Sequence, residues 1–359
     1  EQIRQALRYL QIDEAQDTSL VQHEIIRLIA QDRNLFLVGD EDQSIYGFRG
    51  ATPEKLLSFG TDYPGATILK LEQNYRSTQE IVRACDRMIA HNQQRYAKHM
   101  VTQREQGTPI AFVEQKGSWE QYAYLLQQIQ AKPPHETMAL LYRNNDSAFA
   151  LVDLLSREGI PFFIREQRTS FCKSGVIQDI LAFFALAQDP GDVRAFSRIY
   201  YKTFCHIRKE MALFVRDEIR PHETVFEALL RFPREENIHS GEILSLRNLF
   251  QRVPRESPRR AMGIILNDME YYSVLHRLSS ERVRPQDIQK VEGLLAMASR
   301  CQNIPEFLGR IGQLDDLEVQ ASKQGSQTLC LSTIHASKGL EYDTVVLLDP
   351  YEEILPSPQ

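Results

Sequence analysis

Short apolar runs and helical apolar spacing alternate through the first 165 residues of the chain. The apolar runs predict strands at residues 9–12, 35–38, 66–71, 110–113, 138–141 and 159–164. Between them, apolar residues recur every three or four positions, which predicts helices at 18–30, 79–92, 118–129 and 147–158. Strands alternating with helices are typical of an α/β fold with a parallel, doubly wound sheet.

The pattern changes near residue 190. From 191 to about 324 the spacing is helical almost throughout, and strand signals return at 328–332 and 344–348. The simplest arrangement is an all-helical domain inserted into an α/β domain. We therefore predict four segments: 1–65 as the end of a first sheet domain, 66–190 as the start of a second, 191–325 as the helical insert and 326–359 as the returning part of the second.

Acidic and polar side chains follow the first two predicted strands. Asp13 and Glu14 follow the first strand, and Gln43 follows the second. Parallel sheets bind ligands at the carboxyl ends of their strands, so these residues are candidates for one site. One carboxylate can hold a nucleotide-bound cation while the other orients or deprotonates a water, and the Gln43 amide can reach a terminal phosphate.

Two aromatic residues and a cation follow directly. Tyr46 and Phe48 are interleaved with Arg49, a pattern that can stack single-stranded bases and hold backbone phosphates. The alternative for either ring alone is packing in the core.

Hydrophobic content and charge limit the classes of protein to which this chain can belong. The 359 residues are 42% hydrophobic and 25% charged, as in ordinary globular proteins, and no apolar run approaches the roughly 20 residues that span a membrane. The net charge of −6 argues against a globally basic nucleic-acid coat. The helical segment 191–325 carries 21 Lys and Arg against 19 Asp and Glu, which permits a local DNA contact.

The cysteines concern the cellular compartment of the protein, and the first residues concern the extent of the chain. The five cysteines are far apart and lack zinc or redox spacing, so we expect reduced thiols in a cytoplasmic protein. The opening residues are not a signal peptide and lack an initiator Met, so we expect an excised piece of a longer chain.

Four runs of the sequence resemble the second to fifth motifs of UvrD/PcrA/Rep-type superfamily 1 DNA helicases. They are residues 13–17, 39–51, 72–78 and 331–342, in the family's order and at similar spacing. The likeness covers nearly the whole chain and is loosest in the helical segment. It implies RecA-like sheet domains of the P-loop NTPase type, with only part of the first one present and an all-helical domain inserted into the second.

The resemblance implies a nucleotide-binding role for five residues of the first three runs. Asp13 would coordinate Mg²⁺ through water, and the adjacent Glu14 would share the metal site and act as the catalytic base. Gln43 would sense the γ-phosphate of ATP. Tyr75 would stack on adenine, and Arg76 would stabilise the γ-phosphate as an arginine finger.

The remaining matching residues would contact DNA or couple it to ATP. Tyr46 and Phe48 would stack on bases, although the family usually has Trp where this chain has Phe48, and the neighbouring Arg49 would bind DNA. His335 and Lys338 would lie along the DNA backbone and the coupling path, whereas Glu341 would touch the ribose of ATP. Without the surrounding motif, His335 would be interpreted as a structural residue.

The activity that the resemblance implies is ATP-dependent DNA translocation or unwinding in the 3′ to 5′ direction, on single-stranded DNA and duplex–single-strand junctions. However, a phosphate loop of the form G-x-x-x-x-G-K-[ST] is absent, as is the sixth motif. We therefore expect this chain alone to hydrolyse little or no ATP. Residues 202–208 also replace the family's Thr/Pro-Arg-Gly-Ile-Gly run, which puts the usual duplex contact in doubt.

Two alternative interpretations remain. The chain can belong to a helicase–nuclease related to AddA or RecB, which a carboxylate-rich nuclease block further along the gene would decide. It can also be a degenerate motor that serves as a DNA-binding or interaction module, which a parent gene without a phosphate loop would favour.

Overall fold

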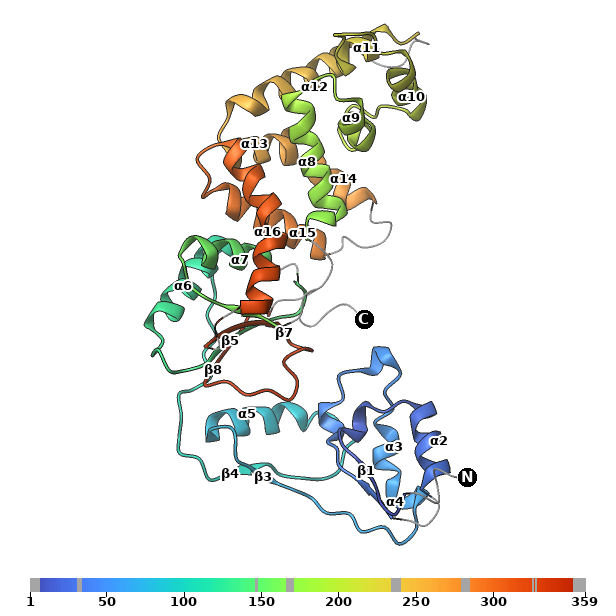
Figure 1. The fold of residues 1–359 in the computed structure, drawn as a ribbon, viewed down its shortest axis with the longest axis vertical. Coiled ribbons are helices and arrows are strands. Elements are labelled where there is room, and N and C mark those ends of the chain that lie inside the picture. The colour runs from blue at the N-terminus through green and yellow to red at the C-terminus, as the bar shows by residue number, and fades with distance from the viewer. Residues whose placement is uncertain are drawn as a thin grey trace. The chain divides into compact units, whose positions relative to one another are not determined.

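Parallel strands and many helices make up the computed structural model, which confirms the α/β class (Figure 1). The structure describes residues 7–30, 34–145, 148–165, 171–233, 240–278, 285–324, 326 and 328–350. These residues form two compact units, one up to Glu114 and the other from Gln115 onward. None of the described helices is both long and apolar enough to cross a membrane.

The first unit is built on two short parallel pairs of strands. Strand β1 (Leu10–Ile12) pairs with β2 (Leu35–Leu37), and β3 (Gln73–Asn74) pairs with β4 (Val101–Thr102). Five short helices and two longer ones connect them: η1 (Ala15–Asp17), α2 (Leu20–Ile29), η2 (Glu41–Gln43), η3 (Gly47–Arg49), α3 (Glu54–Leu57), α4 (Phe59–Asp62) and α5 (Gln79–Ile89).

A capping box starts helix α2. The backbone N–H of Gln22 donates to the Ser19 hydroxyl, and the Gln22 side chain accepts from the backbone N–H of Ser19. These two bonds satisfy donors that a helix start otherwise leaves unpaired. Helix α2 connects β1 to β2 as the crossover that parallel strands require.

The predicted strands at 66–71 and 110–113 are wrong. Neither segment is a strand, and the pairing is limited to β3 and β4. Their apolar side chains lie at the surface: Leu69 is 80% exposed, Leu71 85% and Phe112 92%. An apolar run predicts a buried strand only if neighbouring strands cover it, and the described residues do not cover these two runs.

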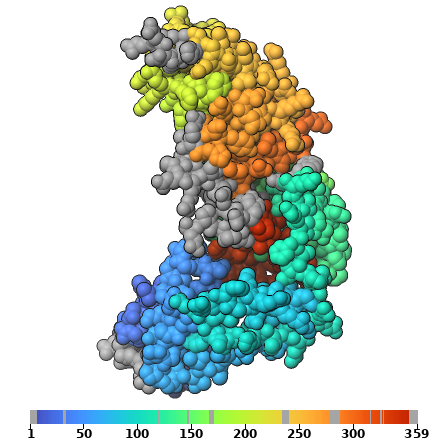
Figure 2. All heavy atoms as spheres, turned by 180° about the vertical axis from the view of Figure 1, so that it is seen from behind, coloured from blue at the N-terminus to red at the C-terminus, as the bar shows by residue number. Residues whose placement is uncertain are grey.

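The second unit begins with strands and helices that alternate. They are α6 (Ser118–Ala131), β5 (Met138–Tyr142), α7 (Ala148–Arg157) and β6 (Phe163–Ile164). The strands β7 (Leu329–Thr333) and β8 (Thr344–Leu347) complete a four-stranded parallel sheet in the order β6-β7-β5-β8. Figure 2 shows the teal atoms of the α6 region beside the red atoms of the returning strands.

Helices fill the sequence between β6 and β7, and no strand occurs among the described residues there. They are η5 (Phe171–Lys173), α8 (Gly175–Gln188), α9 (Val193–Ile199), α10 (Lys209–Glu218), α11 (Val225–Arg231), α12 (Ser240–Arg252), η6 (Val253–Arg255), α13 (Pro258–Gly263), the π-helix η7 (Ile264–Asp268), α14 (Tyr271–Leu278), α15 (Pro285–Ala298) and α16 (Ile304–Gln324). Helix α16 runs back from the other helices to the sheet, where it packs on β6 and α7 (Figure 1).

The compact units and the predicted domains divide the chain at different places. Residues 66–114 cluster with the first unit, whereas the sequence pattern placed a boundary after residue 65. The four-segment domain scheme stays a prediction. The predicted helix start at Ser147 and the segment 351–359 lie outside the described residues. All five cysteines are free thiols, as predicted.

Candidate functional site

Asp13 and Glu14 follow β1 directly, and both are exposed. Hydrogen bonds continue the pairing past the strand ends, because Val38 donates its N–H to the carbonyl of Ile12 (2.8 Å) and Ala15 donates to the carbonyl of Val38 (2.9 Å). The two carboxylates therefore lie beside the chain that leaves β2. This is the edge at which parallel sheets bind ligands.

The backbone of Glu14 is in the left-handed region, with φ 52° and ψ 42°. A glutamate rarely adopts this conformation, which costs about 1–2 kcal/mol in an L-residue. Its N–H donates to Asp13 Oδ1 (2.8 Å), and this bond helps to hold the turn. Residues kept in such a conformation cluster at functional sites, which is independent support for Glu14 as a functional residue.

The structure joins Glu14 to the turn that carries Gln43. The side chain of Gln16 is completely buried and donates through Nε2 to Glu14 Oε2 (2.5 Å), while its Oε1 accepts from the backbone N–H of Asp40 (2.9 Å). Asp40 Oδ2 in turn accepts from Gln43 Nε2 (2.7 Å). Two of the predicted site residues, Glu14 and Gln43, are thus connected through Gln16 and Asp40, to which the motif resemblance gives no role.

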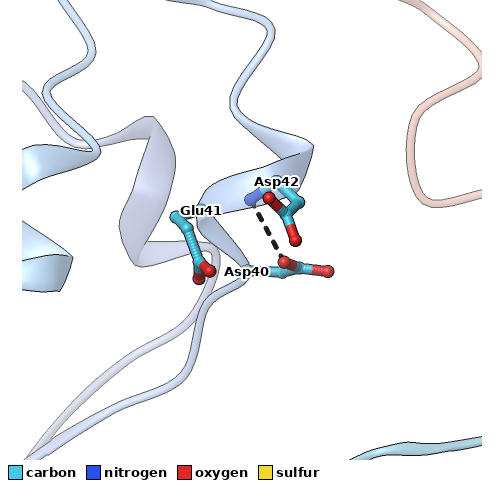
Figure 3. Close-up of side chains that lie close together, drawn as sticks. All are labelled: Asp40, Glu41 and Asp42. Carbon is cyan, nitrogen blue, oxygen red and sulfur yellow. Dashed lines mark hydrogen bonds between the residues drawn. The ribbon is translucent and has the colours of Figure 1, made fainter. Parts of the chain in front are cut away.

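Three consecutive carboxylates, Asp40, Glu41 and Asp42, converge on this turn (Figure 3). Their oxygens come within 4.8 Å of one another. Lys98 Nζ lies 2.5 Å from Asp40 Oδ1, 3.2 Å from Glu41 Oε1 and 3.1 Å from Asp42 Oδ2. Arg95 adds a two-pronged contact to Asp42, with Nη2 2.8 Å from Oδ2.

These contacts stabilise the charged forms of Asp42 and Lys98. Burial tends to raise the pKa of Asp42, but hydrogen bonds from Arg95 and Lys98 outweigh it and lower the pKa. Burial tends to lower the pKa of Lys98, but its bonds to the three carboxylates raise it. Asp42 is therefore ionised above its already low pKa, and Lys98 stays protonated well into alkaline solution.

The donor chemistry distinguishes two places for a divalent cation. At Asp40, Glu41 and Asp42, the ammonium of Lys98 already stands where a metal would have to bind. At Asp13 and Glu14, the carboxylates are exposed at the end of a strand and offer the oxygen ligands that Mg²⁺ prefers. The residues present therefore fit Mg²⁺ at the Asp13–Glu14 end.

Tyr46, Phe48 and Arg49 form a contiguous group at η3, with Tyr46 directly before the helix. The two ring centroids are 6.0 Å apart, and the Arg49 guanidinium lies 4.9 Å from the centre of Tyr46 and 5.5 Å from that of Phe48. Phe48 is 72% exposed, so packing in the core does not describe this ring in the structure.

Tyr75 and Arg76 occupy the exposed turn between β3 and α5 in the same unit. Asn74 Oδ1 accepts from the backbone N–H groups of Arg76 (2.9 Å) and Ser77 (2.8 Å), which shapes the turn. The guanidinium of Arg104 donates to the carbonyl of Tyr75 (2.9 Å). Tyr75 is 77% exposed.

His335, Lys338 and Glu341 lie in the second unit, in the chain that leaves β7. The turn is tight: the Ser337 N–H donates to the carbonyl of Thr333 (3.1 Å), and Gly339 has φ 78°, which glycine adopts without strain. His335 and Lys338 are half-buried, and Glu341 is exposed. The structure thus forms one cluster from the second and third motifs and a separate turn from the fifth.

Sequence reasoning missed the residues that hold the first cluster together. Gln16 lies within one of the motif runs, but nothing in its neighbours shows that both ends of its amide are bonded. Lys98 is 58 residues from Asp40, so no local pattern could have found their ion pair.

Comparisons with known proteins agree with the motifs. The family model described as the UvrD-like helicase C-terminal domain matches residues 69–359, and the UvrD/REP helicase N-terminal domain matches residues 1–64. The chain is 30% identical to the protein YjcD of Bacillus subtilis, covering 99% of the chain and 47% of that protein. It is 29% identical to the ATP-dependent DNA helicase PcrA of Leuconostoc citreum (98% and 50%) and 28% identical to the ATP-dependent DNA helicase Rep of Buchnera aphidicola (98% and 58%).

The chain spans about half the length of the curated relatives it matches. Together, the two family models account for both compact units, from the first motif run to the last. This chain belongs to the family of UvrD-like helicases.

Proposed function

We propose that this chain is the motor portion of an ATP-dependent DNA helicase or translocase that moves 3′ to 5′ along one strand. In this proposal residues 1–65 belong to a first RecA-like domain, residues 66–190 and 326–359 to a second, and segment 191–325 is a helical domain inserted into the second. The observation that carries the proposal is the link from Glu14 through Gln16 and Asp40 to Gln43 at the carboxyl ends of β1 and β2. It joins a candidate base to a candidate phosphate sensor.

The carboxylates would perform the hydrolytic chemistry. Asp13 and Glu14 would hold Mg²⁺, which supplies charge neutralisation for the phosphates of ATP when bound. Glu14 would accept a proton from the attacking water, a role worth about 10²- to 10⁴-fold in rate. The left-handed backbone at Glu14 sets the direction in which its side chain leaves the chain. Such conformations cluster at functional sites, which supports this role for Glu14.

Four further residues would contact the nucleotide. Gln43 would hydrogen-bond the γ-phosphate and transmit its loss to the rest of the turn. Tyr75 offers an exposed ring on which adenine can stack, and Arg76 offers a cation for the charge that develops on the phosphate. Glu341, in the second unit, would contact the ribose.

DNA would bind to the aromatic group on η3 and to the turn after β7. Tyr46 and Phe48 would stack on DNA bases, and Arg49 would pair with the phosphates of the DNA backbone. His335 and Lys338 would follow the phosphates and relay nucleotide state. Single-stranded DNA and duplex–single-strand junctions would be the partners, as for a motor that advances one strand at a time.

The 359 residues contain no G-x-x-x-x-G-K-[ST] run. Such a loop provides the backbone cradle and the lysine that bind the β- and γ-phosphates. We therefore propose that the purified chain alone hydrolyses little or no ATP and that turnover requires the natural full-length polypeptide. Robust turnover by the purified chain that Glu14→Gln abolishes would overturn this point.

The decisive experiment measures ATP hydrolysis by the natural full-length polypeptide with and without single-stranded DNA. We expect DNA to stimulate turnover, and Glu14→Gln to lower kcat by about 10²-fold or more with little change in DNA affinity. Phe48→Ala should instead weaken DNA binding by roughly 5- to 100-fold, because one stacking interaction is lost. A duplex with a 3′ tail should be unwound in preference to one with a 5′ tail.

Several outcomes would contradict the proposal. A rate of ATP hydrolysis that single-stranded DNA does not stimulate, or that Glu14→Gln leaves unchanged, would contradict the proposed motor function. DNA binding with no ATP turnover in the full-length polypeptide would favour a degenerate motor that serves as a binding module.

A further inference from the structure

The buried amide of Gln16 is the centre of a polar network around the candidate site. Its Nε2 bonds Glu14, its Oε1 bonds the backbone of Asp40, and its carbonyl accepts from the Ser44 hydroxyl (3.2 Å). Both ends of the side chain and its backbone are therefore used. A side chain with 0% exposure and all these bonds has one orientation available to it.

Asp40 extends the network to Gln43. Gln43 donates through Nε2 to Asp40 Oδ2 (2.7 Å), so its NH₂ group faces this carboxylate. The other oxygen of Asp40 accepts from the N–H of Asp42 (3.2 Å), which closes the turn (Figure 3). The orientation of the Gln43 amide therefore depends on where the Asp40 carboxylate is held.

Lys98 holds that carboxylate. Its ammonium contacts Asp40, Glu41 and Asp42 at 2.5–3.2 Å, and its side chain is only 12% exposed. Without this cation, three carboxylates within 4.8 Å would repel one another and open the turn. Arg95 could compensate only in part, since its contact is with Asp42.

The segment that supplies Lys98 is itself fixed to the first unit. The backbone N–H of Tyr96 donates to Glu41 Oε1 (2.9 Å), and the Tyr96 hydroxyl donates to the carbonyls of Leu56 (3.0 Å) and Leu57 (3.2 Å) in α3. Residues 95–98 follow α5, whose start adjoins Tyr75 and Arg76. The cation thus comes from the stretch of chain that carries the other two candidate nucleotide contacts.

We infer that Lys98, Asp40 and Gln16 are positioning residues that set the Gln43 amide relative to Glu14, and that Lys98 controls turnover rather than nucleotide or DNA affinity. This inference rests on the proposed function, which assigns Gln43 and Glu14 to phosphate sensing and proton transfer. None of the three positioning residues needs to touch the nucleotide. The effect of Lys98 passes through Asp40.

The test compares Lys98→Met with Lys98→Arg in the natural full-length polypeptide. Methionine keeps the length of the side chain and removes the charge, whereas arginine restores a cation. Lys55→Met is the matched control, because Lys55 also forms an ion pair in the first unit, with Asp62 (3.2 Å), and forms none with Asp40, Glu41 or Asp42. Rates are measured well below the thermal midpoints and divided by the folded fraction.

We expect Lys98→Met to lower kcat by about 10- to 100-fold, as small misplacements of reacting groups do, with KM for ATP and the Kd for single-stranded DNA little changed. Lys98→Arg should recover most of the turnover, and Lys55→Met should leave it unaltered. Hydrogen exchange of the amides at residues 40–44 should accelerate in Lys98→Met and not in Lys98→Arg.

The outcomes separate this inference from the proposed function. Wild-type turnover that Glu14→Gln abolishes and Lys98→Met leaves intact would overturn the inference alone. A loss in Lys98→Met that falls on KM, or that disappears when corrected for the folded fraction, would also overturn it by showing a structural role. A wild-type protein without DNA-stimulated ATP turnover would refute the proposed function and the inference together.

Discussion

Gln16 shows at the residue scale how one buried side chain can hold two segments of the candidate site in place. It is completely buried, donates to Glu14 and accepts from Asp40, and it lies beside Gly39. A Cβ on Gly39 would come within 2.7 Å of Gln16 Oε1. The absence of a side chain at residue 39 therefore makes room for the amide.

Gln16→Leu should destabilise the first unit by about 1–3 kcal/mol, because the partly buried N–H of Asp40 loses its partner while the side-chain volume stays similar. Urea unfolding of the purified chain, followed at first-unit amides by hydrogen exchange, measures the change. Gln93→Leu replaces an exposed glutamine of the same unit and should stay within about 0.5 kcal/mol of wild type. Equal effects from both substitutions would show that the bonds of Gln16 contribute nothing.

Whether the role of a single residue could be predicted from the sequence depends on how near its partners lie along the chain. Asp13, Glu14 and Gln43 could be proposed from sequence because each follows an apolar run that forms a strand. The exposure of Phe48 and its contact with Arg49 also fit the interleaved pattern. Lys98 could not be found in this way, since its three partners lie 56 to 58 residues earlier in the chain.

At the scale of elements, helix α15 approaches α7 closely at one glycine. A Cβ built on Gly293 would overlap the ring of Phe149, which is 1% exposed. That ring is also stacked on Phe171, with centroids 4.0 Å apart, so it has little room to move. Gly309 on α16 is the opposite case, because a Cβ there would meet nothing within 4 Å.

Gly293→Ala should therefore lower the stability of the second unit by about 1–3 kcal/mol through overpacking. Gly309→Ala should raise it by up to about 1 kcal/mol, because alanine is the better helix former. Thermal unfolding of the two variants beside wild type, monitored by circular dichroism, gives both signs in one experiment. A neutral or stabilising Gly293→Ala would mean that α15 and α7 pack less closely than the structure has them.

Strands could be predicted from the sequence where the apolar run is buried on both faces of the sheet. Strand β7 is buried at all five positions, β5 at four of five, and both lie at the predicted places. The runs at 66–71 and 110–113 looked the same in sequence but stay exposed without a covering layer. An apolar run alone does not distinguish a covered strand from an exposed segment, because the strands that cover it come from other parts of the chain.

On the scale of the whole molecule, the apolar core is distributed unequally. Among the described residues up to Glu114, the buried apolar side chains are Ala15, Ile26 and Val82, whereas the second unit has a continuous core that includes β5, β7 and α8. Most large exposed apolar side chains belong to the first unit, Phe36 and Leu71 among them. The overall hydrophobic content of 42% averages over this difference and could not have predicted it.

This inequality predicts that the two units differ in local stability. Amide protection reports the free energy of opening, which grows with the apolar surface that opening exposes. Strands β1 and β2 contain no buried residue, whereas all five positions of β7 are buried. In the purified chain, the amides of β1 and β2 should therefore exchange orders of magnitude faster than those of β5 and β7 after correction for intrinsic rates.

Segment-resolved hydrogen exchange with mass spectrometry makes this comparison within one sample, so β7 serves as the internal control for β1. Limited proteolysis should agree by cutting the first unit before the second. Equal protection in the two units would mean that the polar network around Gln16 and Lys98 stabilises the first unit as strongly as a packed core does the second. That result would require the ion pairs at Asp40, Glu41 and Asp42 to contribute far more than the roughly 1 kcal/mol typical of partly exposed pairs.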